Sequence, residues 1–171
     1  MAAKAAVGEA DKKLSRSDKA LARQLCEWMA DSLLPGEAAL PEGQLVEAAE
    51  FLLEAALLRK EGEPAILMRT AASGRRFMRI AVINPDMPFL VDSIAATIAA
   101  HGLAIDLMVH PIVPVRRDRN GKLTALPDDG DADAKRESMI YIETARVDAK
   151  ERRALEKALA GTLGDVRAVS M

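Results

Sequence analysis

The feature that most constrains the fold is a strand–turn–helix unit between Arg76 and Gly102. Apolar side chains alternate with others from Arg76 to Ile83, which predicts a strand buried mainly on one face. The segment Asn84–Pro88 predicts a turn followed by a proline suited to a helix start. Apolar residues then recur at helical spacing over 90–98, and Gly102 is a typical helix end. This unit predicts a domain of mixed α and β structure.

Residues 103–144 predict two further strands joined by a long connection. Residues 103–115 have a strand pattern, but Pro111 and Pro114 lack amide donors, which favours a sheet edge or a bulge. Residues 116–136 are polar and contain the turn signal Asn120-Gly121, so we expect a long, mobile hairpin connection. Residues 137–144 predict the returning strand.

The last part of the chain predicts a helix and a final strand. Asp148 and Glu151 are a plausible capping pair, Gly164 ends the apolar stripe, and residues 166–171 predict a fourth strand. The order over residues 75–171 is therefore β-α-β-β-α-β. This order predicts an α+β, ferredoxin-like fold, with an antiparallel four-stranded sheet and two helices on one face.

Residues 15–62 predict an N-terminal helical hairpin, with a capping box at Ser15 and Asp18. Residues 1–14 are expected to be a disordered tail, and residues 63–74 join the hairpin to the sheet domain. A helical hairpin alone is marginally stable, so its apolar stripe must pack on the sheet domain or on another chain. The candidate interface residues on that stripe are Leu45, Leu52 and Leu57.

Composition excludes several partner classes. The net charge is −2 and aromatic residues make up 3% of the chain, which argues against a nucleic-acid partner. Cys26 is the single cysteine, so no internal disulfide is possible, and a reducing compartment is expected. No apolar run approaches the roughly 18 residues that a membrane span needs. We therefore expect a cytoplasmic protein without a membrane partner.

The sequence contains no recognisable catalytic, cofactor or metal motif. His101 precedes the helix-ending Gly102, where a structural role is favoured. Asp106 and His110 lie four residues apart on a strand, which separates them by roughly 13 Å and prevents them from holding one metal ion. The acidic loop 128–133 lacks the glutamate of a calcium loop. No Gly-x-Gly-x-x-Gly occurs, so we predict no nicotinamide site, no cofactor and no catalytic residue in this chain.

Two segments remain as candidate binding features. Arg116, Arg117 and Arg119 form a basic cluster that suits an anionic ligand or a partner chain, although a solvated strand edge is the commoner role. The turn of Asn84, Asp86, Met87, Pro88 and Phe89 places backbone amides at a helix N-terminus, where the dipole favours a small carboxylate.

Several segments resemble the large NAD-specific glutamate dehydrogenases of bacteria. The most specific is Asp86-Met-Pro-Phe-Leu-Val-Asp-Ser93, and Gly102-Leu-Ala-Ile-Asp-Leu-Met-Val-His-Pro111 is also similar. Segments at 115–121, 137–143 and 165–169 follow in the same order. The resemblance implies an ACT-like N-terminal region of a long polypeptide, whose distant core oxidises glutamate to 2-oxoglutarate and ammonia with NAD. The implied partners are the remaining domains of that polypeptide, further copies in a homo-oligomer, and an amino-acid effector.

ACT domains bind amino acids at a turn similar to Asp-x-Pro-Gly-x-Leu. Asp86, Pro88 and Leu90 resemble that pattern, whereas Phe89 stands where glycine is usual. A phenylalanine there is expected to fill or cover the space that a ligand needs beside the backbone. The resemblance therefore favours packing, oligomer assembly or allosteric regulation. A free-standing amino-acid sensor and a small enzyme on a ferredoxin-like fold are the alternatives.

Overall fold

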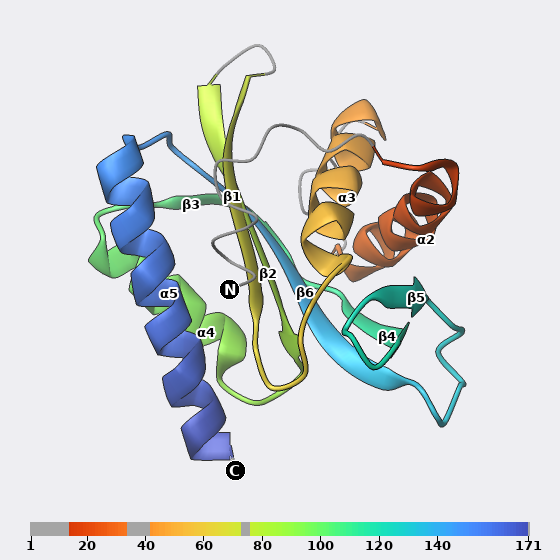
Figure 1. The fold of residues 1–171 in the computed structure, drawn as a ribbon. Helices are drawn as coiled ribbons and strands as arrows, with labels where there is room; N and C mark the ends of the chain where they lie inside the picture. Colours follow the sequence, from red (N-terminus) through yellow and green to blue (C-terminus); the bar gives the residue numbers. More distant parts are fainter. Residues whose placement is uncertain (1–13, 34–41, 73–75, 171) are drawn as a thin grey trace.

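The computed structural model describes residues 14–33, 42–72 and 76–170 (Figure 1). The predicted tail, 1–14, lies outside these residues except for Leu14. The helices are α2 (Arg16–Ser32), α3 (Glu42–Ala56), α4 (Leu90–Ala100) and α5 (Ala149–Ser170). The strands are β1 (Ala65–Ala72), β2 (Arg76–Pro85), β3 (Ile105–Val109), β4 (Ile112–Arg117), β5 (Leu123–Ala125) and β6 (Lys135–Thr144).

All strand pairs of the sheet are antiparallel, in the order β1-β2-β6-β4-β5. Strand β3 also pairs with β6, along the half of β6 that β4 leaves free. The predicted strand 103–115 is therefore split into β3 and β4, with His110 and Pro111 between them. The Met139 amide donates to the Pro111 carbonyl at 3.0 Å, so the interruption still follows β6. The split at Pro111 agrees with the predicted irregularity, whereas Pro114 lies within β4 in regular register with Arg136.

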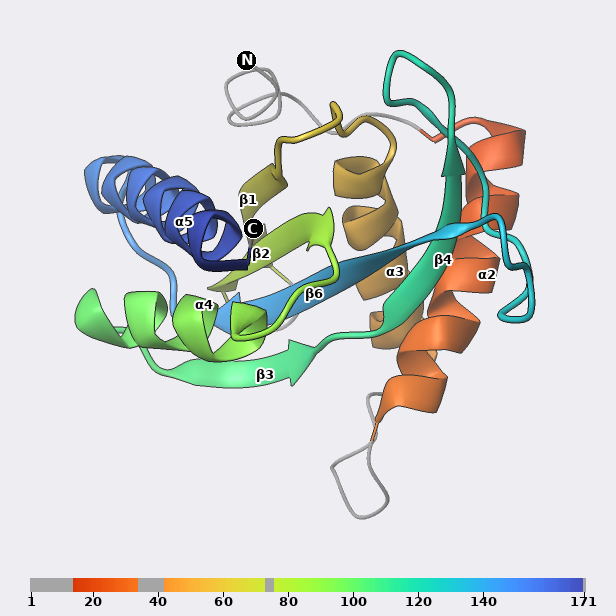
Figure 2. The same cartoon turned by 90° about the horizontal axis from the view of Figure 1, so that it is seen from below.

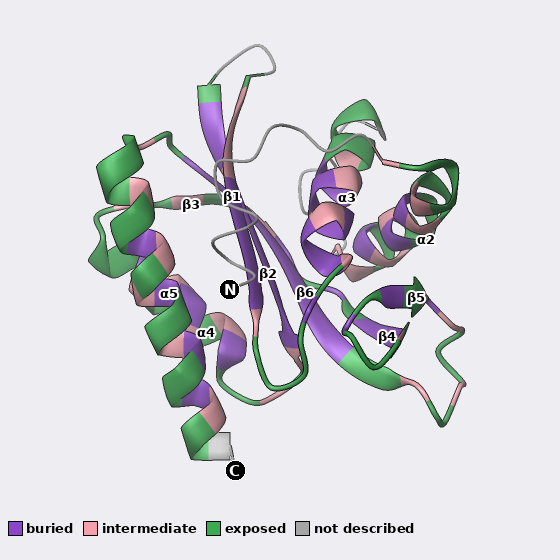
Figure 3. Ribbon diagram, viewed as in Figure 1, coloured by how far each residue is buried: buried purple, intermediate pink, exposed green. Residues whose placement is uncertain are grey.

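The sheet separates two layers of helices (Figure 2). Alternate residues of a strand point to opposite faces, so neighbours on β6 belong to different cores. Met139 and Tyr141 pack with α2 and α3, whereas Ile140 and Ile142 pack with α4 and α5. Figure 3 shows that buried residues run along the central strands and the inner sides of the helices.

The N-terminal hairpin has the local structure that its sequence predicts. Ser15 Oγ accepts from the Asp18 amide at 3.1 Å, and Asp18 Oδ2 accepts from the Ser15 amide at 3.3 Å, which confirms the capping box. The apolar stripe of α3 packs on the sheet of the same chain, where Leu52 and Leu53 are fully buried. The helical hairpin is therefore one outer layer of a three-layer structure, in which the sheet is the middle layer.

Helices α4 and α5 lie on one face of the sheet, as predicted. Buried leucine and isoleucine residues recur at helical spacing on both: Leu90, Ile94 and Ile98 on α4, and Leu155, Leu159 and Leu163 on α5. The hydroxyls of Thr97 and Thr162 lie 2.6 Å apart where the helices meet. The N-terminal end of α4 lies beside the C-terminal end of α5 (Figures 1 and 2).

The prediction of a last strand at 166–171 was wrong. Helix α5 continues through Gly164 to Ser170, because Val166 extends the buried stripe of Leu159 and Leu163 at a spacing of three to four residues. The outer sheet position beside β2 is occupied by β1. This strand lies in the segment 63–74, which the sequence predicts only as a connection between the hairpin and the sheet domain. The predicted order β-α-β-β-α-β is therefore replaced by one in which a strand precedes β2 and a helix ends the described chain.

The connection 116–136 also has more structure than its polar composition predicts. It contains β5, which pairs with β4, and Lys122 forms an isolated bridge with Leu58. The Leu123 amide donates to the Leu57 carbonyl at 2.9 Å. These bonds attach the connection to the end of the helical hairpin.

Candidate functional site

The predicted ligand turn is anchored to the start of β6. Pro85 pairs with Glu137, and the Asp86 amide donates to the Arg136 carbonyl at 3.2 Å. The Ser138 hydroxyl donates to Asp86 Oδ1 at 3.0 Å. The turn therefore has a defined position on the face of the sheet that α4 and α5 cover.

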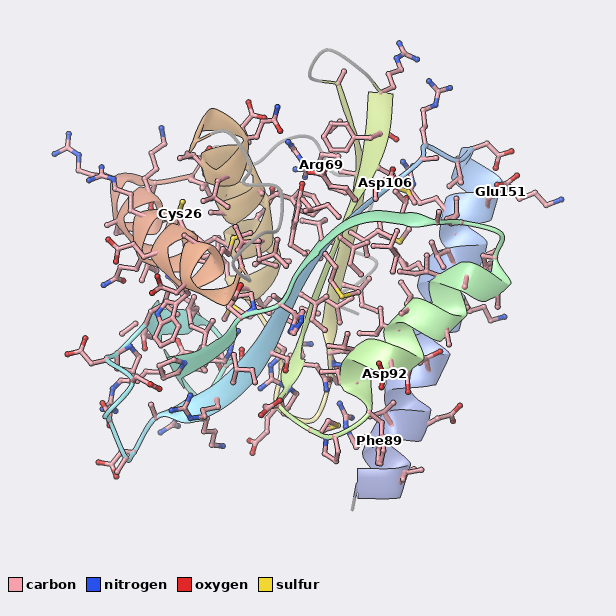
Figure 4. The ribbon with its side chains drawn as sticks, turned by 180° about the vertical axis from the view of Figure 1, so that it is seen from behind. Cys26, Arg69, Phe89, Asp92, Asp106 and Glu151 are labelled. Carbon is pink, nitrogen blue, oxygen red and sulfur yellow. The ribbon has the colours of Figure 1, made fainter. Side chains whose placement is uncertain are left out.

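Phe89 is the most unusual residue of this turn. It is the N-cap of α4 and has φ 68° and ψ 3°, in the left-handed region that favours glycine. Its carbonyl accepts from the Ser93 amide at 3.0 Å, while its side chain is 66% exposed. Figure 4 shows Phe89 at the start of α4, beside the C-terminal part of α5. The glycine-type backbone of the turn is thus kept, and the ring projects to solvent instead of filling a space within the chain.

Asn84 supplies an unpaired polar atom next to the turn. The residue is fully buried, and its Nδ2 donates to the Pro85 carbonyl at 3.0 Å. Its Oδ1 is buried without a hydrogen-bond partner among the described residues. Met87 packs against the α4–α5 core, whereas Pro88 is exposed. Of the five predicted turn residues, only Asn84 therefore holds a buried polar atom without a partner.

The opposite face of β6 carries a buried charge cluster, the triad Arg59–Glu137–Arg117. Arg59 Nε and Nη2 donate to Glu137 Oε2 at 3.0 and 2.8 Å. Arg117 Nε and Nη2 donate to Glu137 Oε2 and Oε1 at 2.9 and 2.8 Å. Burial alone would raise the pKa of Glu137, but the hydrogen bonds and charge of Arg117 and then Arg59 outweigh it and hold the pKa below its ordinary value. Glu137 is therefore a carboxylate, and the three groups carry one net positive charge.

A close backbone contact assembles this triad. Gly121 has φ 88°, and a Cβ at this position would lie 2.4 Å from the Arg59 carbonyl oxygen. The Arg59 amide and Arg117 Nη1 both donate to the Gly121 carbonyl, at 3.0 and 2.8 Å. The turn signal Asn120-Gly121 thus marks the point where the β4–β5 hairpin meets the end of the helical hairpin.

The predicted basic cluster is divided by the structure. Arg117 belongs to the triad, while Arg116 pairs with Asp131 on the exposed side of the connection. Arg119 is exposed and has no ion pair among the described residues. A hydrogen bond from the Asp133 backbone amide lowers the pKa of Asp131, and the hydrogen bond from the Arg116 side chain lowers it further.

A second polar network ties α3 to the sheet. Arg69 makes a bidentate pair with Glu54 at 2.8 and 2.9 Å, and Arg79 Nη2 lies 3.1 Å from Glu47. The buried Tyr141 hydroxyl donates to Glu143 at 2.7 Å, and burial, followed by this bond, raises the pKa of Tyr141. These contacts hold the hairpin layer in place.

The other predicted residues lie apart from both sites. Leu52 is fully buried in the chain's own core, and Leu45 and Leu57 are half-buried against the same core. His101 Nδ1 lies 3.0 Å from the Thr97 carbonyl oxygen at the end of α4. Cys26 is half-buried on α2.

The described residues include no group of three or more His, Cys, Asp or Glu side chains that could hold a metal ion. Within the same residues, no helix has both the length and the apolar content that a bilayer crossing requires.

Arg59 and Glu137 were not predicted as site residues. Arg59 was predicted to lie within the helical hairpin 15–62, but α3 ends at Ala56, so no periodic pattern marks Arg59 as a site residue. Glu137 carries a weak signal, because strand alternation places it on the same face as the buried Met139 and Tyr141. An ionisable residue on a buried face requires a partner, but the sequence does not say which residue supplies it.

Comparison with known proteins agrees with the resemblance. The family described as glutamate dehydrogenase, ACT1 domain, matches residues 22–159. A protein of Pseudomonas aeruginosa named NAD-specific glutamate dehydrogenase is 38% identical over 91 residues, which is 52% of this chain. A protein of Halomonas elongata with the same name is 36% identical over 91 residues, again 52% of this chain. The match covers 6% of the length of each relative. No solved structure gives a significant match.

The family match extends from α2 to the middle of α5, so it includes the helical hairpin as well as the sheet. It also contains both the turn at Phe89 and the triad at Glu137. The chain therefore belongs to the glutamate dehydrogenase ACT1 domain family.

Proposed function

We propose that this chain is a packing and assembly module of an NAD-specific glutamate dehydrogenase and does not itself turn over glutamate. The family match and the names of both relatives support this assignment. The full enzyme would oxidise L-glutamate to 2-oxoglutarate and ammonia with NAD bound elsewhere in the polypeptide. The partner of this module would be the remainder of that polypeptide, within a homo-oligomer.

The observation that carries the proposal is the exposed, left-handed Phe89. A non-glycine residue in this backbone region costs on the order of 1 kcal/mol or more. A ring that is 66% exposed returns little of that cost by burial within the chain. The left-handed backbone and the exposed ring of Phe89 are both explained if the ring is an aromatic anchor that becomes buried against another domain. Such anchors contribute most of the binding energy of interfaces.

The first test measures NADH formation by this chain with L-glutamate and NAD. The expected result is no turnover above the protein-free rate, because the sequence contains no Gly-x-Gly-x-x-Gly loop for a nicotinamide cofactor. Sustained NADH formation that depends on the chain would overturn the proposal.

The second test replaces Phe89 in the full-length enzyme. Phe89→Asn keeps the backbone conformation, because asparagine tolerates positive φ and is a good N-cap, but it removes the ring. The expected result is dissociation of the assembly, or looser packing seen as faster proteolysis between domains, measured by mass photometry and limited digestion. Val46→Asn is the matched control, since Val46 is 42% exposed on α3, far from this turn in the chain. Equal behaviour of both variants and the unchanged enzyme would count against Phe89 as an anchor.

Asn84 favours a second candidate function, the binding of an amino-acid effector at the turn. Its buried Oδ1 lacks a partner and is a suitable acceptor for the ammonium group of an amino acid. A thermal-shift screen with the common amino acids tests this role. A shift with one amino acid that disappears in Asn84→Leu supports a sensor, whereas no shift with any of them leaves assembly as the function.

A further inference from the structure

A depression of about 340 Å³ lies between the loop after α3, the β4–β5 hairpin and the start of β6. Its wall includes all three members of the triad, Arg59, Arg117 and Glu137, and the exposed Arg119. It opens on the face of β6 opposite the Phe89 turn, since Glu137 and Ser138 are neighbours on one strand and point to opposite sides. It is therefore separate from the predicted ligand turn.

The buried charges of this depression do not cancel. The side chains of Arg59 and Arg117 are 7% and 10% exposed, and that of Glu137 is 1% exposed. Two guanidinium groups face one carboxylate, which leaves one positive charge in a region where water screens poorly. A buried charge without full compensation is costly unless a partner is supplied.

The acidic residues around the opening do not supply that partner. Glu61 is 93% exposed, and its carboxylate lies 3.9 Å from the Lys135 ammonium group. The opposite charges of these two solvent-exposed groups balance each other. Asp118 and Asp133 are both exposed, so water screens their negative charges and they compensate the buried guanidinium groups only weakly. The charge at the floor of the depression therefore remains positive.

Hydrogen-bond donors are available at the same place. Nε and Nη2 of Arg117 each donate one hydrogen bond to Glu137, and Nη1 donates one to the Gly121 carbonyl. A guanidinium has five N–H donors, so two of them have no partner among the described residues. Arg119 adds a second positive charge at the rim. Guanidinium groups recognise carboxylate and phosphate oxygens through paired hydrogen bonds.

We propose that this depression binds a small oxyanion with two negative charges, in which Arg117 holds one group of oxygens and Arg119 neutralises the second charge. The shared chemistry is that of dicarboxylates and phosphate. Binding would complete the compensation of the triad. This site is independent of the assembly role proposed for Phe89.

Isothermal titration calorimetry of the chain at pH 8 and low salt tests the site with succinate, inorganic phosphate and acetate. The expected result is saturable binding of succinate or phosphate at one ion per chain, with acetate several-fold weaker because it carries one charge. The arm that binds identifies the kind of oxyanion. Absence of saturable binding in all three arms overturns the proposal.

Matched variants locate the binding. Arg119→Gln should raise the dissociation constant of the oxyanion by about two- to fivefold, the range for loss of an exposed charge. Arg153→Gln removes one exposed cation from α5 and should leave binding unchanged, as should Phe89→Asn on the other face of the sheet. Equal affinity of Arg119→Gln and the unchanged chain, or a loss in Phe89→Asn, would place the ion elsewhere and overturn the proposal.

Discussion

At the scale of single residues, Gly121 depends on the absence of a side chain for two separate reasons. Its φ of 88° favours glycine, and an added Cβ would lie 2.4 Å from the Arg59 carbonyl oxygen. Gly62 has a similar φ of 81° but has no atom within 4 Å of the added Cβ. The two positions therefore separate the backbone cost from the steric cost.

We expect Gly121→Ala to lower the free energy of unfolding by about 1–3 kcal/mol more than Gly62→Ala, because only the first change also displaces backbone. Urea unfolding of both variants measures the difference. Equal destabilisation would show that the β4–β5 hairpin moves away from Arg59 without cost.

The triad makes a pH-dependent contribution to stability. The folded pKa of Glu137 lies below its ordinary value of 4.5, so the unfolded chain binds this proton more readily. The contribution is fully present above about pH 4.5 and is lost as the pH falls through the folded pKa. Glu137→Gln should therefore cost about 3–5 kcal/mol at pH 7 and should flatten the fall in stability below pH 5.

Glu156→Gln is the control for this pH dependence. Burial raises the pKa of Glu156 more than Arg152 lowers it, so the folded chain binds this proton more readily than the unfolded chain. Its removal should change the slope of stability against pH in the opposite direction. If Glu137→Gln and the unchanged chain lose stability in parallel from pH 7 to pH 3, the triad does not act through this carboxylate.

At the scale of elements, α5 provides a test of the corrected C-terminus. Gly161 and Gly164 lie inside the helix, and an added Cβ at either position meets no atom within 4 Å. Alanine is more favourable than glycine in a helix interior by about 0.8–1.0 kcal/mol. We expect Gly164→Ala to raise the free energy of unfolding by roughly that amount, as measured by chemical denaturation.

Gly102→Ala is the matched control, because Gly102 has φ 76° after α4 and its replacement is strained. It should therefore destabilise the chain. Destabilisation by Gly164→Ala as well would indicate that residue 164 adopts a turn, as the original strand prediction requires.

At the scale of the whole molecule, the two helical layers share one sheet and should unfold together. Leu52 lies in the core between the hairpin and the sheet, and Leu159 lies in the core between α5 and the sheet. Both are fully buried, so replacement by alanine should cost about 2–5 kcal/mol in each case. Because β2 and β6 contribute to both cores, each variant should destabilise the entire chain.

Trp28 fluorescence and far-ultraviolet circular dichroism test this cooperativity. Trp28 is the single tryptophan and lies on α2, so its signal reports the hairpin layer, whereas circular dichroism reports all elements. We expect coincident transitions in the unchanged chain, in Leu52→Ala and in Leu159→Ala. An earlier fluorescence transition in Leu52→Ala alone would mean that the hairpin unfolds as a separate unit.

The sequence by itself determined the local elements and the family. The capping box at Ser15, the strand–turn–helix unit and the apolar faces of α3, α4 and α5 follow from periodicity and from capping residues, which act over a few positions. The motif from Asp86 to Ser93, together with the similar segments that follow it in the same order, identified the family, which the match over residues 22–159 confirms.

Only the tertiary structure decided which strand completes the sheet and which charges meet. The outer position beside β2 is occupied by β1 and not by residues 166–171, because Val166 is buried with Leu159 and Leu163 on the inner face of α5. Arg59 and Glu137 are 78 positions apart, and no local pattern relates them. Their pairing arises because the end of the helical hairpin, the Gly121 turn and the start of β6 are brought together by the burial of two hydrophobic cores, which is a property of the folded chain as a whole.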